Sequence, residues 1–269
     1  MSTKTISHFQ WIIDLLFPLQ CLNCSQENTW LCNRCKIELI SILANHCAFC
    51  EAKTLFGNTC TTCRKRHYLD GAVSCVPYAN PLIQTLIHAW KYSGVKEVTK
   101  YISEFVQHAL AKEHKKIQAQ SSKILDTGIT KHHLPALSTI PPILTNQYIL
   151  LNPIPLHPKK QKERGFNQAQ VLARDLALTK SNYKEVQFLD RAKKTTSQAT
   201  LQGYDRAINI SNAFIIREHE KISIKGKHIV IVDDVITTGG TIDACAKLLK
   251  TAGAASVWAL TAAYGHPIK

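Results

Sequence analysis

Two carboxylates followed by a Thr- and Gly-rich turn form the strongest chemical pattern in the chain. In the segment IVIVDDVITTGGT, residues 229–241, Asp233 and Asp234 follow four apolar, β-forming residues. Adjacent carboxylates can accept hydrogen bonds from a vicinal diol or approach the ligand shell of Mg²⁺. The turn after them supplies backbone N–H groups and hydroxyls at the start of an expected helix, where phosphate binds readily. The pattern predicts a pentose-phosphate site; aspartates that only cap the helix are the alternative.

The candidate ligands of that site include the residues that follow the aspartates. They are Asp233, Asp234, Val235, Thr237, Thr238, Gly239, Gly240 and Thr241.

Eight of the ten cysteines form four Cys-x-x-Cys pairs in a short N-terminal segment. The pairs are Cys21/Cys24, Cys32/Cys35, Cys47/Cys50 and Cys60/Cys63. Two such pairs supply the four thiolates of a closed, structural zinc site. The alternative, thiol redox motifs or buried apolar cysteines, is disfavoured because the segment holds too few apolar residues for a core of its own. We expect two zinc ions in a module spanning residues 1–70, with the pairs grouped either in chain order or interleaved.

A basic segment follows an expected strand at residues 148–155. Lys159, Lys160, Lys162 and Arg164 precede Gly165, so we expect a mobile loop whose four cations fold over a pyrophosphate. A solvated basic loop is the simpler alternative. Three residues beyond it are ambiguous. Phe166 is either a lid or a core anchor, while Asn167 and Gln168 either cap the next helix or contact ligand. Lys91 is a further candidate cation.

Hydrophobic periodicity predicts the elements that must hold these residues. Expected strands at 148–155, 227–234 and 256–263 alternate with expected helices at 168–178 and 241–252. Such alternation indicates parallel strands with right-handed crossovers, hence an α/β domain spanning 71–269. Residues 81–111 read as two helices broken around Ser93 and Gly94. The polar, Pro-containing stretch near 112–147 reads as a long connection.

The charge is strongly basic and unevenly distributed. The 269 residues include 33 Lys and Arg against 19 Asp and Glu, a net charge of +14, of which residues 1–70 carry only +2. This balance favours an anionic partner without identifying it. Asp14 and Pro18 interrupt the first apolar stretch, and no apolar run reaches the length of a membrane span, so we expect a cytoplasmic protein. Residues 9–17 could form an interfacial helix or pack on the cysteine module.

The motifs of this chain resemble those of two protein families. Residues 229–241 resemble the 5-phosphoribosyl-1-pyrophosphate (PRPP) binding motif of type I phosphoribosyltransferases. That resemblance implies that Asp233 and Asp234 hold the ribose hydroxyls, that Thr237–Thr241 hold the 5′-phosphate, and that Mg²⁺ accompanies PRPP. HAWKYSG at 88–94, PIPLHPKKQKERGFNQAQ at 153–170 and TTSQATLQGYDRAINISNAF at 195–214 resemble the ComF competence family. Its members join an N-terminal four-cysteine zinc module to a phosphoribosyltransferase-like parallel sheet, and the analogy places a pyrophosphate loop near Pro155–Pro158.

The ComF resemblance also implies a function in natural transformation. It implies a PRPP-binding protein that aids uptake of single-stranded DNA, working with other competence proteins as a peripheral protein of the inner membrane. The alternative is a metabolic phosphoribosyltransferase with no direct DNA role. The motifs describe the PRPP donor and reveal no acceptor pocket. An aromatic content of 7% argues against extensive base stacking. The candidate DNA contacts are the basic residues Arg64, Lys65, Arg66, Arg191, Lys193 and Lys194.

Overall fold

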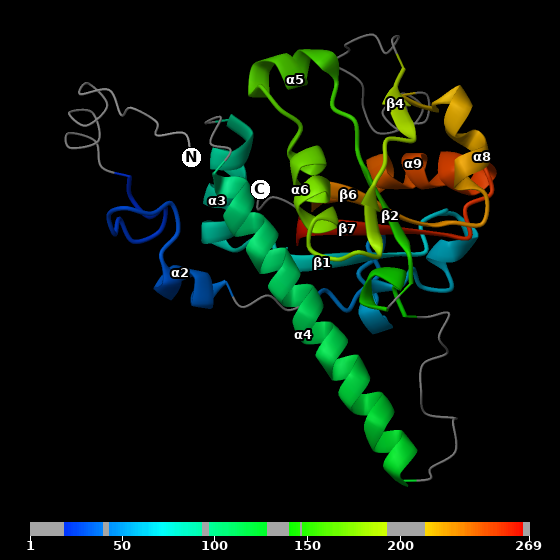
Figure 1. The fold of residues 1–269 in the computed structure, drawn as a ribbon, viewed down its shortest axis with the longest axis horizontal. Coiled ribbons are helices and arrows are strands. Elements are labelled where there is room, and N and C mark those ends of the chain that lie inside the picture. Colours follow the sequence, from blue (N-terminus) through cyan, green and yellow to red (C-terminus); the bar gives the residue numbers. More distant parts are fainter. Residues whose placement is uncertain are drawn as a thin grey trace.

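A parallel sheet forms the centre of the molecule in the computed structural model (Figure 1). The structure describes residues 19–39, 43–92, 97–127, 140–145, 147–192 and 213–265, with only the backbone described at 38 and 120–127. The five strands lie in the order β1-β7-β6-β2-β3, and every neighbouring pair is parallel. The strands are β1 (Gly71–Pro77), β2 (Ile149–Pro153), β3 (Tyr183–Glu185), β6 (His228–Ile236) and β7 (Ser256–Tyr264). The predicted α/β class is confirmed, although β1 and β3 were not among the expected strands.

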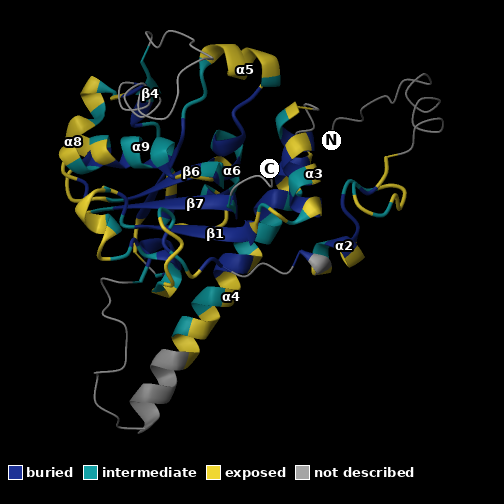
Figure 2. Cartoon of the chain, turned by 180° about the vertical axis from the view of Figure 1, so that it is seen from behind, coloured by how far each residue is buried: buried dark blue, intermediate teal, exposed yellow. Residues whose placement is uncertain are grey.

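Helices cover both faces of this sheet, as the buried strands in Figure 2 show. Successive residues of β6 alternate between two apolar clusters: Val230 packs in the first, and Ile229 and Ile231 in the second. The first cluster contains the buried sides of α3 (Pro81–Tyr92), α4 (Val98–Thr127) and α6 (Gln168–Ala177). The second contains that of α9 (Gly240–Thr251). The helices after β2 and β6 therefore leave toward opposite faces.

The smaller elements lie around the sheet. A separate two-stranded antiparallel sheet pairs β4 (Leu189–Arg191) with β5 (Phe214–Ile216). The short α-helices are α2 (Asn33–Glu38), α5 (Pro158–Arg164) and α8 (Lys221–Ile224). The 3₁₀ turns are η1 (Leu55–Gly57), η2 (Cys63–Lys65), η5 (Pro142–Leu144) and η6 (Glu218–Glu220).

The expected connection near 112–147 begins as helix, because α4 continues to Thr127. Residues 112–127 contain neither Pro nor Gly, and Gly128 is the first helix breaker after them. The helix projects away from the sheet in Figure 1. Residues 111–119 of this helix are exposed or half-buried, so their polarity is that of a largely exposed helix and not of a loop. The two helices expected within 81–111 are present as α3 and the start of α4; Ser93 and Gly94, the expected break, lie outside the described residues.

The cysteine segment is divided between the two faces. Cys21, Leu31 and Cys35 join the apolar cluster of α3 and α4. Lys36 pairs with Glu104 of α4 at 2.7 Å, and the Thr29 hydroxyl lies 3.2 Å from that of Tyr101. The second half of the segment packs on the opposite face, where Ala48 and Phe49 contact the cluster that contains α9.

No described helix has the length and apolar character needed to cross a membrane. Residues 9–17 lie outside the described residues.

Candidate functional site

The two aspartates lie where the sheet divides. The ladder between β2 and β6 ends at the pair Pro153 and Val232, whereas β6 continues beside β7 as far as Ile236. Asp233 and Asp234 therefore stand past the end of β2, and α6 and α9 diverge to opposite faces from this edge. In open α/β sheets a crevice at such a point, outside the carboxyl ends of the strands, is the usual ligand site.

The two carboxylates have different partners. Asp234 pairs with Lys91 of α3, with Nζ and Oδ2 2.9 Å apart and both side chains largely buried. One carboxylate oxygen of Asp233 accepts a hydrogen bond from the Asp234 backbone N–H at 2.9 Å. Burial first, and then the negative charge of Asp234, raises the pKa of Asp233 from 3.8 to about 7, although Lys91 and Arg164 oppose the rise. The pKa of Asp233 is thus raised toward neutral pH, whereas Asp234 is ion-paired with Lys91.

The Thr- and Gly-rich turn leads directly into α9. Thr237 and Thr238 are exposed, and Gly239 is the N-cap residue with φ of 72°. Glycine adopts this left-handed conformation without steric cost. The first intrahelical bond runs from Asp243 N–H to the Gly239 carbonyl at 2.8 Å, so the amides between them lack intrahelical partners. The turn can therefore direct backbone N–H groups at a phosphate, as the sequence predicts.

The basic segment after β2 is a helix and not the mobile loop that the sequence suggested. The His157 side chain accepts the Lys159 N–H at 3.2 Å, and Gly165 ends α5 with φ of 76°. Both caps favour helix, so the four cations are carried by α5 and not by a loop, and their contact with pyrophosphate stays a prediction. Lys159, Lys160 and Lys162 are exposed. Arg164 is the one whose charge acts on Asp233.

Arg164 belongs to a chain of contacts that links α6 to α3. Its guanidinium donates to Gln168 Oε1 at 3.3 Å, and the Gln168 amide donates to the Trp90 carbonyl at 3.0 Å. Asn167 caps α6 and also donates to the Ile154 carbonyl at 2.9 Å. Phe166 is buried in the first apolar cluster. Phe166 therefore takes the role of core anchor, whereas Asn167 caps the helix and its contact with ligand stays a prediction.

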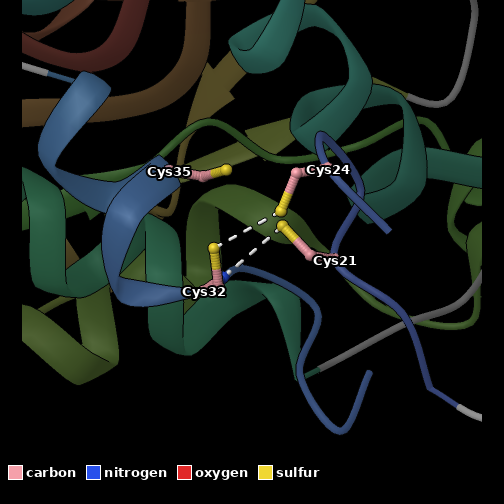
Figure 3. A group of neighbouring side chains, drawn as sticks. All are labelled: Cys21, Cys24, Cys32 and Cys35. Atoms are coloured by element: carbon pink, nitrogen blue, oxygen red, sulfur yellow. Dashed lines mark hydrogen bonds between the residues drawn. The ribbon is translucent and has the colours of Figure 1, made fainter. Parts of the chain in front are cut away.

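Both cysteine clusters form in chain order, and the interleaved grouping is excluded. Within each cluster the four Sγ atoms lie within 4.8 Å of one another. Cys24 and Cys32 lie 3.6 Å apart in the first (Figure 3), as do Cys50 and Cys60 in the second. Four thiolates bound tetrahedrally at 2.3 Å from zinc would lie about 3.8 Å apart. The two clusters could therefore each hold a zinc ion.

The candidate DNA contacts are found in different surroundings. Arg64, Lys65 and Arg66 are exposed beside Tyr68, whose ring lies 5.5 Å from Nζ of Lys247. Arg191 is half-buried, with its guanidinium 5.2 Å from the Phe214 ring and a buried Nε without a hydrogen-bond partner. Lys193 and Lys194 lie outside the described residues. Arg191 therefore differs from Arg64, Lys65 and Arg66, because its side chain is not part of an exposed basic surface.

Arg191 lines a groove of 820 Å³ between the end of β2 and the two-stranded sheet of β4 and β5. Pro155 and Asn167 line one side of this groove. On the other, Arg217 pairs with Asp190 through two bonds of 2.9 and 2.8 Å. Sequence reasoning did not identify Asp190 of β4 or Arg217, which follows β5, because strands of three residues carry no motif.

Comparison with known proteins agrees with this geometry. A family model described as the phosphoribosyl transferase domain matches residues 162–266, which include both aspartates and the turn into α9. The parallel sheet and its site therefore define a phosphoribosyltransferase-like domain.

Several curated proteins are similar to the chain. DNA utilization protein YhgH of Salmonella typhi is 38% identical over 109 residues, 40% of this chain and 46% of that protein. Competence protein F of Haemophilus influenzae is 36% identical over 115 residues, 41% and 49% of the two chains. Competence protein ComFC of Bacillus subtilis is 31% identical over 125 residues, 46% and 48% of them. The match spans about half the length of these relatives. The similarities support a phosphoribosyltransferase-like protein of the ComF family.

Proposed function

We propose that the crevice at the ends of β2 and β6 binds PRPP together with Mg²⁺. The turn Thr237–Thr241 holds the 5′-phosphate, and Asp233 and Asp234 hold the ribose hydroxyls. The observation that carries the proposal is the Lys91–Asp234–Asp233 cluster beside the N-terminus of α9, at the point where the helices diverge. When bound, Mg²⁺ neutralises the pyrophosphate. Lys91 and Arg164 supply the protein's own positive charge at the same place.

A transfer reaction would also use the groove beside β4. The bond between the ribose anomeric carbon and pyrophosphate breaks while an acceptor nitrogen bonds to that carbon, and positioning supplies most of the rate enhancement. The groove adjoins the end of β2 and offers donors from Arg191 and Arg217. It is large enough for an acceptor. A metabolic transferase without a DNA role would use the same arrangement.

Calorimetric titration with PRPP and Mg²⁺ tests the binding proposal. We expect Asp233→Asn combined with Asp234→Asn to weaken binding by at least about tenfold. Glu185→Gln is the matched control, because Glu185 pairs with Arg174 at 3.2 Å away from the crevice. Failure of the wild-type protein to bind, or equal binding by the double variant, would refute the proposal.

We further propose that the chain handles single-stranded DNA in natural transformation, at the inner membrane and with other competence proteins. The exposed Arg64, Lys65 and Arg66, together with Tyr68 and Lys247, combine phosphate-binding cations with a stacking ring. The names of the relatives, which refer to DNA utilization and competence, favour the same function.

Fluorescence anisotropy with a labelled single-stranded oligonucleotide tests this proposed DNA binding. Binding that survives loss of Asp233 and Asp234 separates it from the PRPP site, whereas absence of any binding by the wild-type protein would overturn it.

A further inference from the structure

The second cysteine cluster lies directly against the turn proposed to hold phosphate. Phe49 lies between Cys47 and Cys50, and its ring packs on Gly239. A Cβ atom at Gly239 would lie 2.8 Å from Cε1 of Phe49, a distance that Cβ atoms essentially never show, so the ring or the turn would have to shift. Glycine at this position therefore serves the close contact with the ring as well as the positive φ.

The same module also contacts the first turn of α9. The His67 ring stacks on Phe49, with centroids 3.7 Å apart and planes 6° from parallel, and His67 Nδ1 lies 2.9 Å from Oδ2 of Asp243. The other oxygen of Asp243 accepts the N–H groups of Tyr68 and Leu69 at 2.7 and 3.1 Å. Phe49 thus contacts the turn, and residues 67–69, which follow the second cysteine cluster, contact α9, the helix that begins after the turn.

The contacts extend to the start of the turn and to the neighbouring strand. His46, Ala48 and Glu51 line a small hollow together with Thr237, and the His46 ring lies 4.7 Å from that of Tyr264 at the end of β7. Residues on both sides of Cys47 therefore reach the edge of the sheet at which the turn begins.

The first cluster provides an internal comparison. Its described contacts, from Thr29 and Lys36, run to α4 on the opposite face of the sheet. Asn23 occupies in its first pair the position that Phe49 occupies in the second cluster, and it donates a bond of 3.3 Å to Cys35 Sγ. The two clusters thus have the same four cysteine ligands, but the first packs against α4 and the second against the turn that begins α9.

We infer that the second cluster, through Phe49, positions the turn Thr237–Thr241 for a sugar 5′-phosphate, and that the first cluster does not. The identity of the ligand, a sugar 5′-phosphate, rests on the proposed PRPP function. The positioning of the turn by Phe49 rests on the packing alone. Phe49 is a positioning residue: it acts through its contact with Gly239, which fixes the direction of the backbone N–H groups at the start of α9. A metal ion in the second cluster would hold Phe49 in place by fixing Cys47 and Cys50 on either side of it.

Ribose 5-phosphate and inorganic pyrophosphate are the two probes of the experiment, because each carries one end of PRPP. We expect Phe49→Ala to weaken ribose 5-phosphate binding about tenfold in calorimetry, to leave pyrophosphate binding within about twofold, and to retain two zinc ions. Phe49→Tyr should restore most of the affinity. Asn23→Ala is the control and should bind both probes as the wild type does.

A pair of ligand variants tests the role of the metal. Cys60→Ser and Cys24→Ser should each reduce the zinc content from two ions to one, and only Cys60→Ser should weaken ribose 5-phosphate binding. Equal weakening by both variants, or full affinity in Phe49→Ala, would overturn the inference.

Hydrogen exchange separates this inference from the proposed function. Exchange at the amides of Asp243, Ala244 and Cys245 should accelerate in Phe49→Ala and not in Asn23→Ala. If the wild-type protein binds neither PRPP nor ribose 5-phosphate while exchange still responds, the proposed function fails and the structural inference stands. Unchanged exchange in Phe49→Ala would refute the inference whatever PRPP does.

Discussion

Asp233 and Asp234 are neighbours in sequence with different electrostatic surroundings. Asp234 has Lys91 at 2.9 Å, whereas Asp233 accepts a backbone N–H, is buried beside the like charge of Asp234, and is influenced by Lys91 and Arg164 more weakly. The pKa of Asp233 therefore rises to about 7. A ligand that donates hydroxyl hydrogens to Asp233, or a cation that approaches it, favours the ionised carboxylate. Binding of such a ligand should accordingly release a proton from this site near neutral pH.

The raised pKa of Asp233 predicts a pH-dependent stability difference. The folded state binds this proton more tightly than the unfolded state does. The free energy of unfolding of the protein should therefore fall as pH rises from about 4 to about 7. Asp233→Asn removes the effect, so its free energy of unfolding should exceed that of the wild type by an amount that grows over this range. One pKa unit corresponds to about 1.4 kcal/mol, which limits the gain to about 4 kcal/mol. Urea unfolding at pH 5 and pH 8 measures it; a constant difference would contradict the prediction.

Lys91 should matter for folding as well as for ligand. Lys91→Met leaves the largely buried Asp234 without its cation, which should lower the free energy of unfolding by about 1–3 kcal/mol at pH 8. Combining it with Asp234→Asn should recover most of the loss, because neither partner is then charged. A double-mutant cycle from denaturant unfolding provides the measurement. Additive effects of the two substitutions would show that the pair contributes nothing.

Elements with strong local patterns were predictable, and those fixed by tertiary contacts were not. The apolar run before Asp233 and the glycines after it determine β6 and the start of α9 within one segment. Helix α5 has no apolar periodicity and depends on the His157 and Gly165 caps. The contact of Phe49 with Gly239 joins residues far apart in sequence. The candidate residues within one motif were therefore predictable, and Lys91 was a further candidate, whereas the contact of Phe49 with the turn was not predictable.

The attachment of α9 to residues 67–69 can be broken at Asp243. Asp243→Ala removes the acceptor of the Tyr68 and Leu69 N–H groups, and we expect a loss of about 1–3 kcal/mol in the free energy of unfolding. Hydrogen exchange at these two amides should accelerate as well. Asp243→Asn keeps a side-chain oxygen for them and should recover much of the protection. If Asp243→Ala left both amides protected, another group would have to hold this segment.

At the scale of the whole molecule, the net charge of +14 falls into several unlike groups. Lys91 and Arg164 act at the carboxylate crevice, while Lys112, Lys115 and Lys116 are exposed on the projecting half of α4. Arg64, Lys65 and Arg66 lie beside the second cysteine cluster. A sugar phosphate accounts for the first group alone. A long anionic chain such as single-stranded DNA is the kind of partner that the third group, beside an exposed tyrosine, is suited to bind.

The salt dependence of DNA binding distinguishes these exposed groups. Each phosphate contact with a single strand contributes about 0.7 to the slope of log affinity against log salt, so Arg64→Ala, Lys65→Ala and Arg66→Ala together should reduce the slope by about 2. The triple variant Lys112→Ala, Lys115→Ala and Lys116→Ala removes the same charge from α4 and is the matched control. Anisotropy titrations of an oligonucleotide at several salt concentrations give both slopes. Equal reductions would mean that net charge alone attracts DNA, whereas a change confined to the first variant would locate the DNA contact beside the second cysteine cluster.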